Sequence, residues 1–166
     1  MLRDKSLIPL SHQHQRALAL CVRIDRAQPI PESDLLAWQV EIEQQFEREI
    51  KVHFAAEEEV VFPAARQFAK LIPLIEELIS EHDWLRKSFA QAGARRLSAG
   101  DLPVFARRLS DHIRKEERQL FESMQRLMTS TGLADIGLRL EAALKDATQS
   151  CVLTNAATKL KAKRYP

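Results

Sequence analysis

Two copies of one short motif decide the fold of this chain. Residues 53–62 read HFAAEEEVVF and residues 112–121 read HIRKEERQLF, so both match H-x-x-x-E-E-x-x-[V/L]-F. Helix positions four apart lie one turn above each other on the same face. The repeat therefore predicts two helices that each point one imidazole and one carboxylate the same way: His53 with Glu57, and His112 with Glu116.

Each copy follows a segment that carries a further histidine on its apolar face. His14 lies on one stripe with Leu18 and Cys21, and His82 lies on one stripe with Leu85. The chain thus consists of two helix pairs, each of which supplies two histidines and one glutamate to the interior.

Helical periodicity and turn signals predict helices over about residues 11–26, 34–68, 73–97 and 101–127. Short connections favour an all-α fold, an up-down-up-down antiparallel four-helix bundle with a short C-terminal helical extension over residues 133–147. We expect residues 1–131 to form the bundle. Residues 132–166 then form a C-terminal helix and a basic tail, packed on or trailing from the same domain.

The composition is that of an ordinary globular protein. The 166 residues are 45% hydrophobic and 29% charged with a net charge of +2, so we expect neither a nucleic-acid partner nor a membrane partner. No run approaches the roughly 18–20 apolar residues of a membrane span, and the N-terminus lacks the apolar stretch of a secretory signal. Cys21 and Cys151 suggest no disulfide framework, and a cytoplasmic location is expected.

Six side chains are the predicted metal ligands. A lone histidine on an apolar face is more often a core residue than a ligand, but four such histidines with two inward glutamates would make a poor core. Imidazole with carboxylate suits non-haem iron, manganese or zinc, and six ligands suit two metals that share bridging carboxylates. The set is His14, His53, Glu57, His82, His112 and Glu116.

The fifth histidine and the acidic residues beside the predicted ligands are not expected to bind the metal. His12 lies about 200° around its helix from His14, so we expect it at the surface or near a helix cap. Other acidic residues lie beside the predicted ligands and either contact them or are exposed: Glu58, Glu81, Asp111 and Glu117.

These motifs resemble those of the hemerythrin-like, histidine–histidine–glutamate cation-binding domains. Residues 10–18, LSHQHQRAL, are similar to the first helix of the family, in which the ligand histidine follows the serine by three residues and is here His14. Residues 53–63 resemble the second helix, and residues 81–82 and 111–117 resemble the third and fourth. The resemblance covers roughly residues 8–128.

The resemblance implies two iron ions (Fe2+/Fe3+) with an oxo or hydroxo bridge, and zinc or manganese as substitutes. The sequence differs from those of the oxygen-carrying hemerythrins, whose third helix has two ligand histidines four residues apart. Here His82 is followed at that spacing by Arg86 and preceded by Leu78. The four-histidine set is closer to bacterial iron-centre repair proteins and iron-sensing hemerythrin-like domains.

Several functions stay open on the sequence. The leading expectation is a protein that binds or senses O2, NO or iron at a carboxylate-bridged centre. The alternatives are a di-iron redox enzyme that reduces peroxide or nitric oxide, and an iron donor for iron–sulfur repair. Ferritin-type centres use Glu-x-x-His, the reverse of the order found here, which argues against that class.

Overall fold

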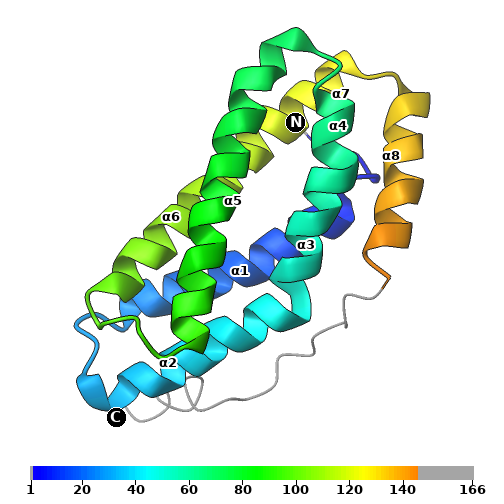
Figure 1. Ribbon diagram of the computed structural model, residues 1–166. Helices are drawn as coiled ribbons and strands as arrows, with labels where there is room; N and C mark the ends of the chain where they lie inside the picture. The colour runs from blue at the N-terminus through cyan, green and yellow to red at the C-terminus, as the bar shows by residue number, and fades with distance from the viewer. Residues whose placement is uncertain (1, 146–166) are drawn as a thin grey trace.

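A computed structural model describes residues 2–145, and every regular element in that range is a helix (Figure 1). The elements are α1 (Ile8–Arg26), α2 (Glu32–Gln45), η1 (Phe46–Ile50), α3 (Lys51–Ala56), η2 (Glu57–Val61), α4 (Phe62–Ala65), η3 (Ala69–Leu71), α5 (Ile72–Gly93), α6 (Asp101–Lys115), η4 (Glu116–Phe121), α7 (Glu122–Leu127) and α8 (Ser130–Ala143). The predicted all-helical class is confirmed over these residues. None of these helices is long and apolar enough to cross a membrane.

The predicted helices match the observed ones apart from their ends. The first begins at Ile8, three residues early, because Pro9 fits the first helical turn, where a missing N–H leaves no bond unmade. The third ends at Gly93 rather than near residue 97, because Arg95 adopts a left-handed backbone (φ 60°) that a helix does not continue through.

Three of the elements are π-helical turns, which the sequence pattern does not predict. Elements α2 to α4 form one helical run with π turns at η1 and η2, and the run bends between α2 and α3 (Figure 1). Elements α6 and α7 form a second run with a π turn at η4. Glu57 is the first residue of η2 and Glu116 the first of η4, so both turns begin at a predicted ligand. Such turns occur frequently at functional sites.

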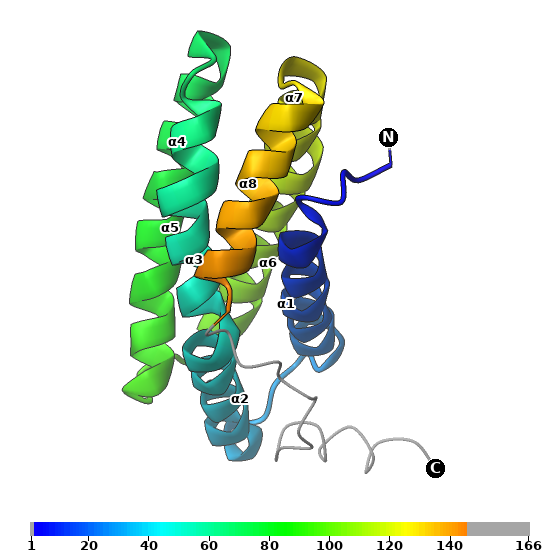
Figure 2. The same ribbon diagram turned by 90° about the vertical axis from the view of Figure 1, so that its right-hand side faces the viewer.

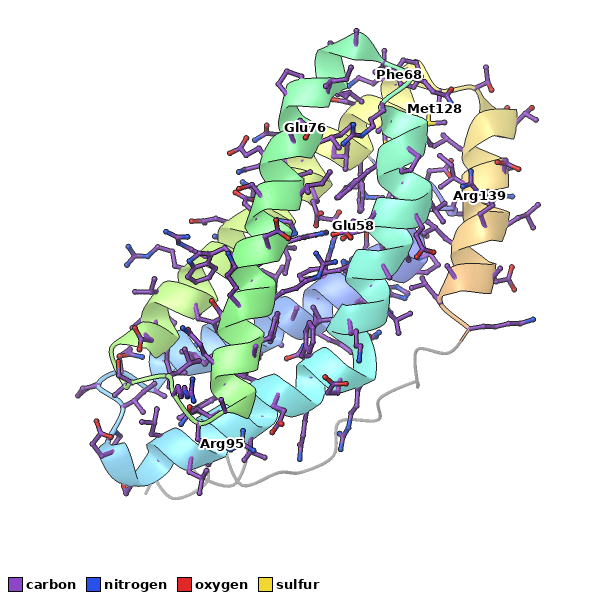
Figure 3. The ribbon with its side chains drawn as sticks, viewed as in Figure 1. Glu58, Phe68, Glu76, Arg95, Met128 and Arg139 are labelled. Carbon is purple, nitrogen blue, oxygen red and sulfur yellow. The ribbon has the colours of Figure 1, made fainter. Side chains whose placement is uncertain are left out.

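Pro63 lies in α4, in the run from α2 to α4, and leaves one carbonyl of that run without its usual helical partner. In a regular helix its N–H would donate to the carbonyl of Glu59, but proline has no N–H. The Glu59 carbonyl instead accepts a hydrogen bond from Arg139 of α8 at 3.3 Å. Figure 3 labels Arg139 on α8. The carbonyl left free by the proline thus makes one polar contact with the last helix.

The buried apolar side chains form two separate clusters, one on each side of the predicted ligands. Helix α1 packs on α6, α2 on α5, and α5 on α6. One cluster includes Ala17, Phe54, Leu85 and Leu109, and the other includes Leu10, Val61, Leu78 and Leu120. Along each helical run the predicted ligands fall between the two clusters, so the polar site forms a layer through the core.

Helix α8 lies along the outside of α3 and η2 (Figure 2). Its buried side chains are Leu133, Ile136 and Leu140, and the Thr129 side chain caps its first turn by accepting from the N–H of Gly132 at 3.1 Å. The end of the predicted extension at residues 146–147 and the basic tail at residues 159–164 lie outside the described residues.

Candidate metal centre

The six predicted ligands meet at one place in the bundle. They come from six separate elements and are at most 2% exposed: His14 (α1), His53 (α3), Glu57 (η2), His82 (α5), His112 (α6) and Glu116 (η4). Their ligand atoms form two groups that share both glutamates. One group adds His14 and His53, and the other adds His82 and His112.

Each glutamate presents one oxygen to each histidine pair. Oε1 of Glu57 lies 3.1 Å from Nε2 of His53, while its Oε2 lies 3.4 Å from Nε2 of His82. Oε2 of Glu116 lies 3.2 Å from Nε2 of His14, while its Oε1 lies 3.3 Å from Nε2 of His112. This arrangement is that of two carboxylates, each able to bridge two cations.

Within each pair the two imidazoles face each other through their Nε2 atoms. The Nε2–Nε2 distance is 3.0 Å between His14 and His53, and 3.1 Å between His82 and His112. Two nitrogens bound at right angles to one ion, each about 2.1 Å from it, lie about 3.0 Å apart. The spacing of each pair therefore suits a single metal ion.

The other ring nitrogen, Nδ1, of every histidine lies against an oxygen acceptor. The four contacts are His14 to Glu117 at 2.7 Å, His53 to Gln13 at 2.8 Å, His82 to Glu58 at 2.7 Å and His112 to Glu81 at 2.8 Å. An acceptor on this side holds the proton on Nδ1, so the lone pair of Nε2 points into the site. Figure 3 shows Glu58 at the middle of the bundle.

The electrostatics of the site demand positive charge. Burial raises the pKa of the Glu57 carboxyl, but contacts with His53 and His14 outweigh it and hold that pKa well below its usual range. Burial and the Glu57 charge also raise the pKa of Glu116, but His112 and His14 outweigh them and lower it to about 2. Burial lowers the pKa of His112, yet Glu116 and Glu81 raise it to about 9. Protons on the histidines therefore balance the carboxylates wherever no metal does.

Both oxygens of Glu57 and both of Glu116 are buried and have no hydrogen-bond partner. A buried carboxylate without partners is costly, because water no longer solvates its charge. Two cations between the histidine pairs would satisfy all four oxygens, so the donor set fits a pair of hard or borderline metal ions.

Aromatic rings close the site on several sides. The ring of Phe54 stacks on His82 at 3.9 Å between centroids, Phe62 lies 5.5 Å from His82, and Phe121 stacks on His14 at 5.7 Å. These rings fix the imidazoles and exclude bulk water from the polar layer.

A surface pocket of about 420 Å³ reaches the outer side of this layer. Its lining includes Glu81, Trp84, Arg108 and Lys115. Lys115 donates to Glu81 at 2.5 Å, and Glu81 accepts from His112. A hydrogen-bonded chain therefore links the pocket to one histidine of the centre.

The structure separates the remaining candidates. His12 is exposed, whereas His14 is buried in the site. Among the neighbouring acidic residues, Glu58, Glu81 and Glu117 contact histidines, whereas Asp111 is exposed and pairs with Arg114 at 3.2 Å.

Sequence reasoning missed the groups that hold these contacts in place. They are Gln13, which touches His53, together with Arg3 and Ser11 on Glu117, Arg86 on Glu58 and Lys115 on Glu81. One signal for Gln13 was present, because it directly precedes His14 as Glu81 directly precedes His82.

Comparison with protein-family models matched the Hemerythrin HHE cation binding domain over residues 9–123. Comparison with curated proteins gave no match, and comparison with solved structures gave none either. The matched range spans more than half of the chain and holds all six predicted ligands. The chain belongs to the hemerythrin HHE cation-binding family.

Proposed function

We propose that the protein binds two iron ions at this centre and takes up a small ligand there, O2 or NO, as a binding or sensing protein. One ion would be held by His14 and His53, the other by His82 and His112. Glu57 and Glu116 would bridge the two. The proposal includes the up-down-up-down packing of four helical runs, which would bring one histidine from each run to the same level.

The observation that carries the proposal is the set of four buried carboxylate oxygens without partners. Each glutamate offers one oxygen to each histidine pair, at 3.1–3.4 Å from the nearest ring nitrogens. A structural core would not leave four such oxygens unsatisfied. A pair of cations supplies what they lack.

The surroundings of the centre support a small apolar ligand. Two ions would each receive two nitrogens and two carboxylate oxygens from the chain, which leaves about two positions open on a six-coordinate ion. The iron pair, when bound, supplies ligand binding and reversible oxidation. The rings of Phe54, Phe62 and Phe121 exclude water and favour a diatomic molecule over a charged one.

One observation favours redox turnover as an alternative. The chain from Lys115 through Glu81 to His112 connects the centre to a surface pocket that also exposes Trp84. Such a chain can carry protons during reduction of peroxide or nitric oxide. Transfer of iron to an iron–sulfur protein is a third use of the same centre.

The test is an anaerobic titration of the iron-loaded protein with NO and with O2, followed by absorbance and electron paramagnetic resonance. The proposal predicts uptake that saturates in proportion to bound iron, with no continued consumption. Sustained consumption of hydrogen peroxide or NO in the presence of a reductant would favour the enzyme instead. Loss of iron to an apo iron–sulfur acceptor would favour the donor.

Variants assign the result to the centre. His53→Ala and Glu116→Ala should abolish uptake, and His12→Ala should leave it unchanged, because His12 is exposed and outside the cluster. A full response in Glu116→Ala would mean that the ligand binds elsewhere.

A further inference from the structure

The contacts around the four histidines repeat in the two halves of the chain. Glu58 and Glu117 each follow a bridging glutamate, and each accepts from the histidine of α5 or α1, respectively. Gln13 and Glu81 each precede a site histidine, and each accepts from Nδ1 of the histidine on α3 or α6 at 2.8 Å. The two halves therefore hold their histidines by equivalent contacts.

The equivalence fails in the charge of one acceptor. Glu81 is a carboxylate, whereas its counterpart Gln13 is an amide. The Gln13–His53 contact is buried, and Gln13 is 5% exposed, so bulk solvent does not screen the difference in charge between the two acceptors. On their Nδ1 atoms, His14 and His53 thus have one carboxylate acceptor between them, while His82 and His112 have two.

The acceptor on Nδ1 sets how strongly Nε2 binds a cation. A carboxylate draws the Nδ1 proton toward itself and makes the ring a better electron donor, and hydrogen bonds to ionised acceptors are about twice as strong as neutral ones. Cations pair with these carboxylates, but they contact the carboxylates rather than the rings: Arg3 on Glu117, Arg86 on Glu58 and Lys115 on Glu81. Lys115 is also shared with Glu77. The rings themselves therefore differ in their direct partners.

On the metal binding proposed above, on which this inference rests, we propose that the two metal positions are unequal and that Gln13 makes the difference. The position between His82 and His112 binds a divalent ion first and holds it longer. The position between His14 and His53 fills second and releases its ion first. Gln13 acts as a positioning residue, because it touches His53 and not the metal.

Zinc titration of metal-free protein tests this order directly. Long-range 1H–15N correlation spectra follow the ring nitrogens of each histidine as zinc is added up to two equivalents. At one equivalent the Nε2 signals of His82 and His112 should shift, and those of His14 and His53 should follow with the second. This reading needs no variant, so it does not depend on the folding of one.

An exchange of the two acceptors supplies the matched control. The double variant Gln13→Glu/Glu81→Gln keeps the net charge and should reverse the order of filling. Glu81→Gln alone should weaken the first zinc step by about 10- to 100-fold in competition with a chelator. Gln13→Glu alone should strengthen the second step.

Two results would overturn the inference while leaving the metal centre intact. All four rings could shift together in the wild-type protein, or the double variant could fill in the wild-type order. A different result, in which no ring nitrogen responds to zinc, would overturn the proposed centre itself.

Discussion

At the scale of single residues, the centre is defined by buried charge. Two carboxylates with no hydrogen-bond partner lie among four imidazoles, and each imidazole is held by an acceptor on its other nitrogen. Protons or metal ions must balance the two negative charges. The competition between these two kinds of cation can be measured.

Metal binding should release protons at neutral pH. In the metal-free protein the pKa of His112 is raised to about 9 and that of His14 well above its ordinary value, because the nearby glutamates outweigh burial. The His112 ring is therefore protonated at pH 7.5, and a metal must displace its proton. An indicator dye in weak buffer should record proton release on zinc binding, and the amount should fall as the pH rises through about 9.

Rising pH affects the stability of the metal-free fold and the binding of metal in opposite directions. A raised histidine pKa stabilises the metal-free fold fully below pH 6.5, and this contribution is lost as the pH rises through about 9.

The control for the proton-release measurement is His12→Ala, which should release the same number of protons as the wild-type protein on zinc binding. No release at pH 7.5 would contradict the charge balance described here.

Cys21 should be unreactive in the folded protein. It is 4% exposed, and burial raises the pKa of its thiol to about 12, so the reactive thiolate is almost absent at pH 8. In a Cys151→Ser variant, Cys21 carries the one remaining thiol. A thiol-specific dye should label Cys21 in this variant only after denaturation. Rapid labelling of the native variant would place Cys21 at an accessible position and contradict its packing.

The sequence predicted which ligand residues would be brought together, because inward spacing and the repeat both point to them. It also distinguished His14 from His12, which lies on the other side of α1. It did not predict the contact of Gln13 with His53, because that contact joins two helices and depends on their rotation about their axes. Whether the six residues ligate a metal stays a prediction.

Among the secondary-structure elements, the π turns could not be predicted from the sequence. The hydrophobic pattern of a helix, at 3.6 residues per turn, does not reveal one extra residue within it. Yet Glu57 and Glu116 each begin a π turn, and the apolar residues that follow still reach the core. The extra residue allows the glutamate and the later apolar side chains to face inward together.

Deletion of Arg118 tests the role of η4. Arg118 is exposed, and its removal takes one residue out of the π turn, so a regular α-helix can carry Leu120 and Phe121 on the same inward face. We expect the free energy of unfolding to change by about 1 kcal/mol or less, because no large buried side chain leaves the core. Urea denaturation followed by circular dichroism measures it.

Arg118→Ala is the matched control for the deletion. Because it changes only an exposed side chain, it should alter the stability by no more than about 0.5 kcal/mol. A deletion that costs about 3 kcal/mol or more, the scale of losing a large buried side chain, would mean that the π turn does not absorb an extra residue.

At the scale of the whole molecule, the metal layer divides the core. One apolar cluster lies on each side of it, and the layer between them contains six buried ionisable side chains. Such a layer contributes little to folding by itself, since buried ion pairs often offset their own desolvation and no more. The bound metal should therefore be a main source of cohesion between the two ends.

Removal of metal should lower the thermal stability of the protein. A ligand at one hundred times its dissociation constant adds about 2.7 kcal/mol per site, and each kcal/mol shifts Tm by about 2–4 °C in a chain of this size. Scanning calorimetry before and after chelation should show a fall of at least about 5 °C, restored by adding metal back. Two results would show that metal at this centre does not stabilise the fold. Chelation could leave the Tm of the wild-type protein unchanged, or it could lower the Tm of a Glu57→Ala/Glu116→Ala double variant by the same amount.

The fold as a whole was predictable to the level of a helical bundle, because four long amphipathic segments with short connections have few other ways to bury their apolar faces. The contact of Arg139 on α8 with the Glu59 carbonyl was not predictable, because it depends on how α8 lies along the outside of η2. The division at residues 131 and 132 stays a prediction.

The metal content of the purified protein shows whether the buried cluster holds two irons. The protein is expressed with iron, zinc and manganese all available, and elemental analysis then counts each metal per chain. We expect about two irons per chain in the wild-type protein and in His12→Ala, and a clear loss in His14→Ala. One metal per chain, zinc alone, or a loss in His12→Ala with retention in His14→Ala would contradict it.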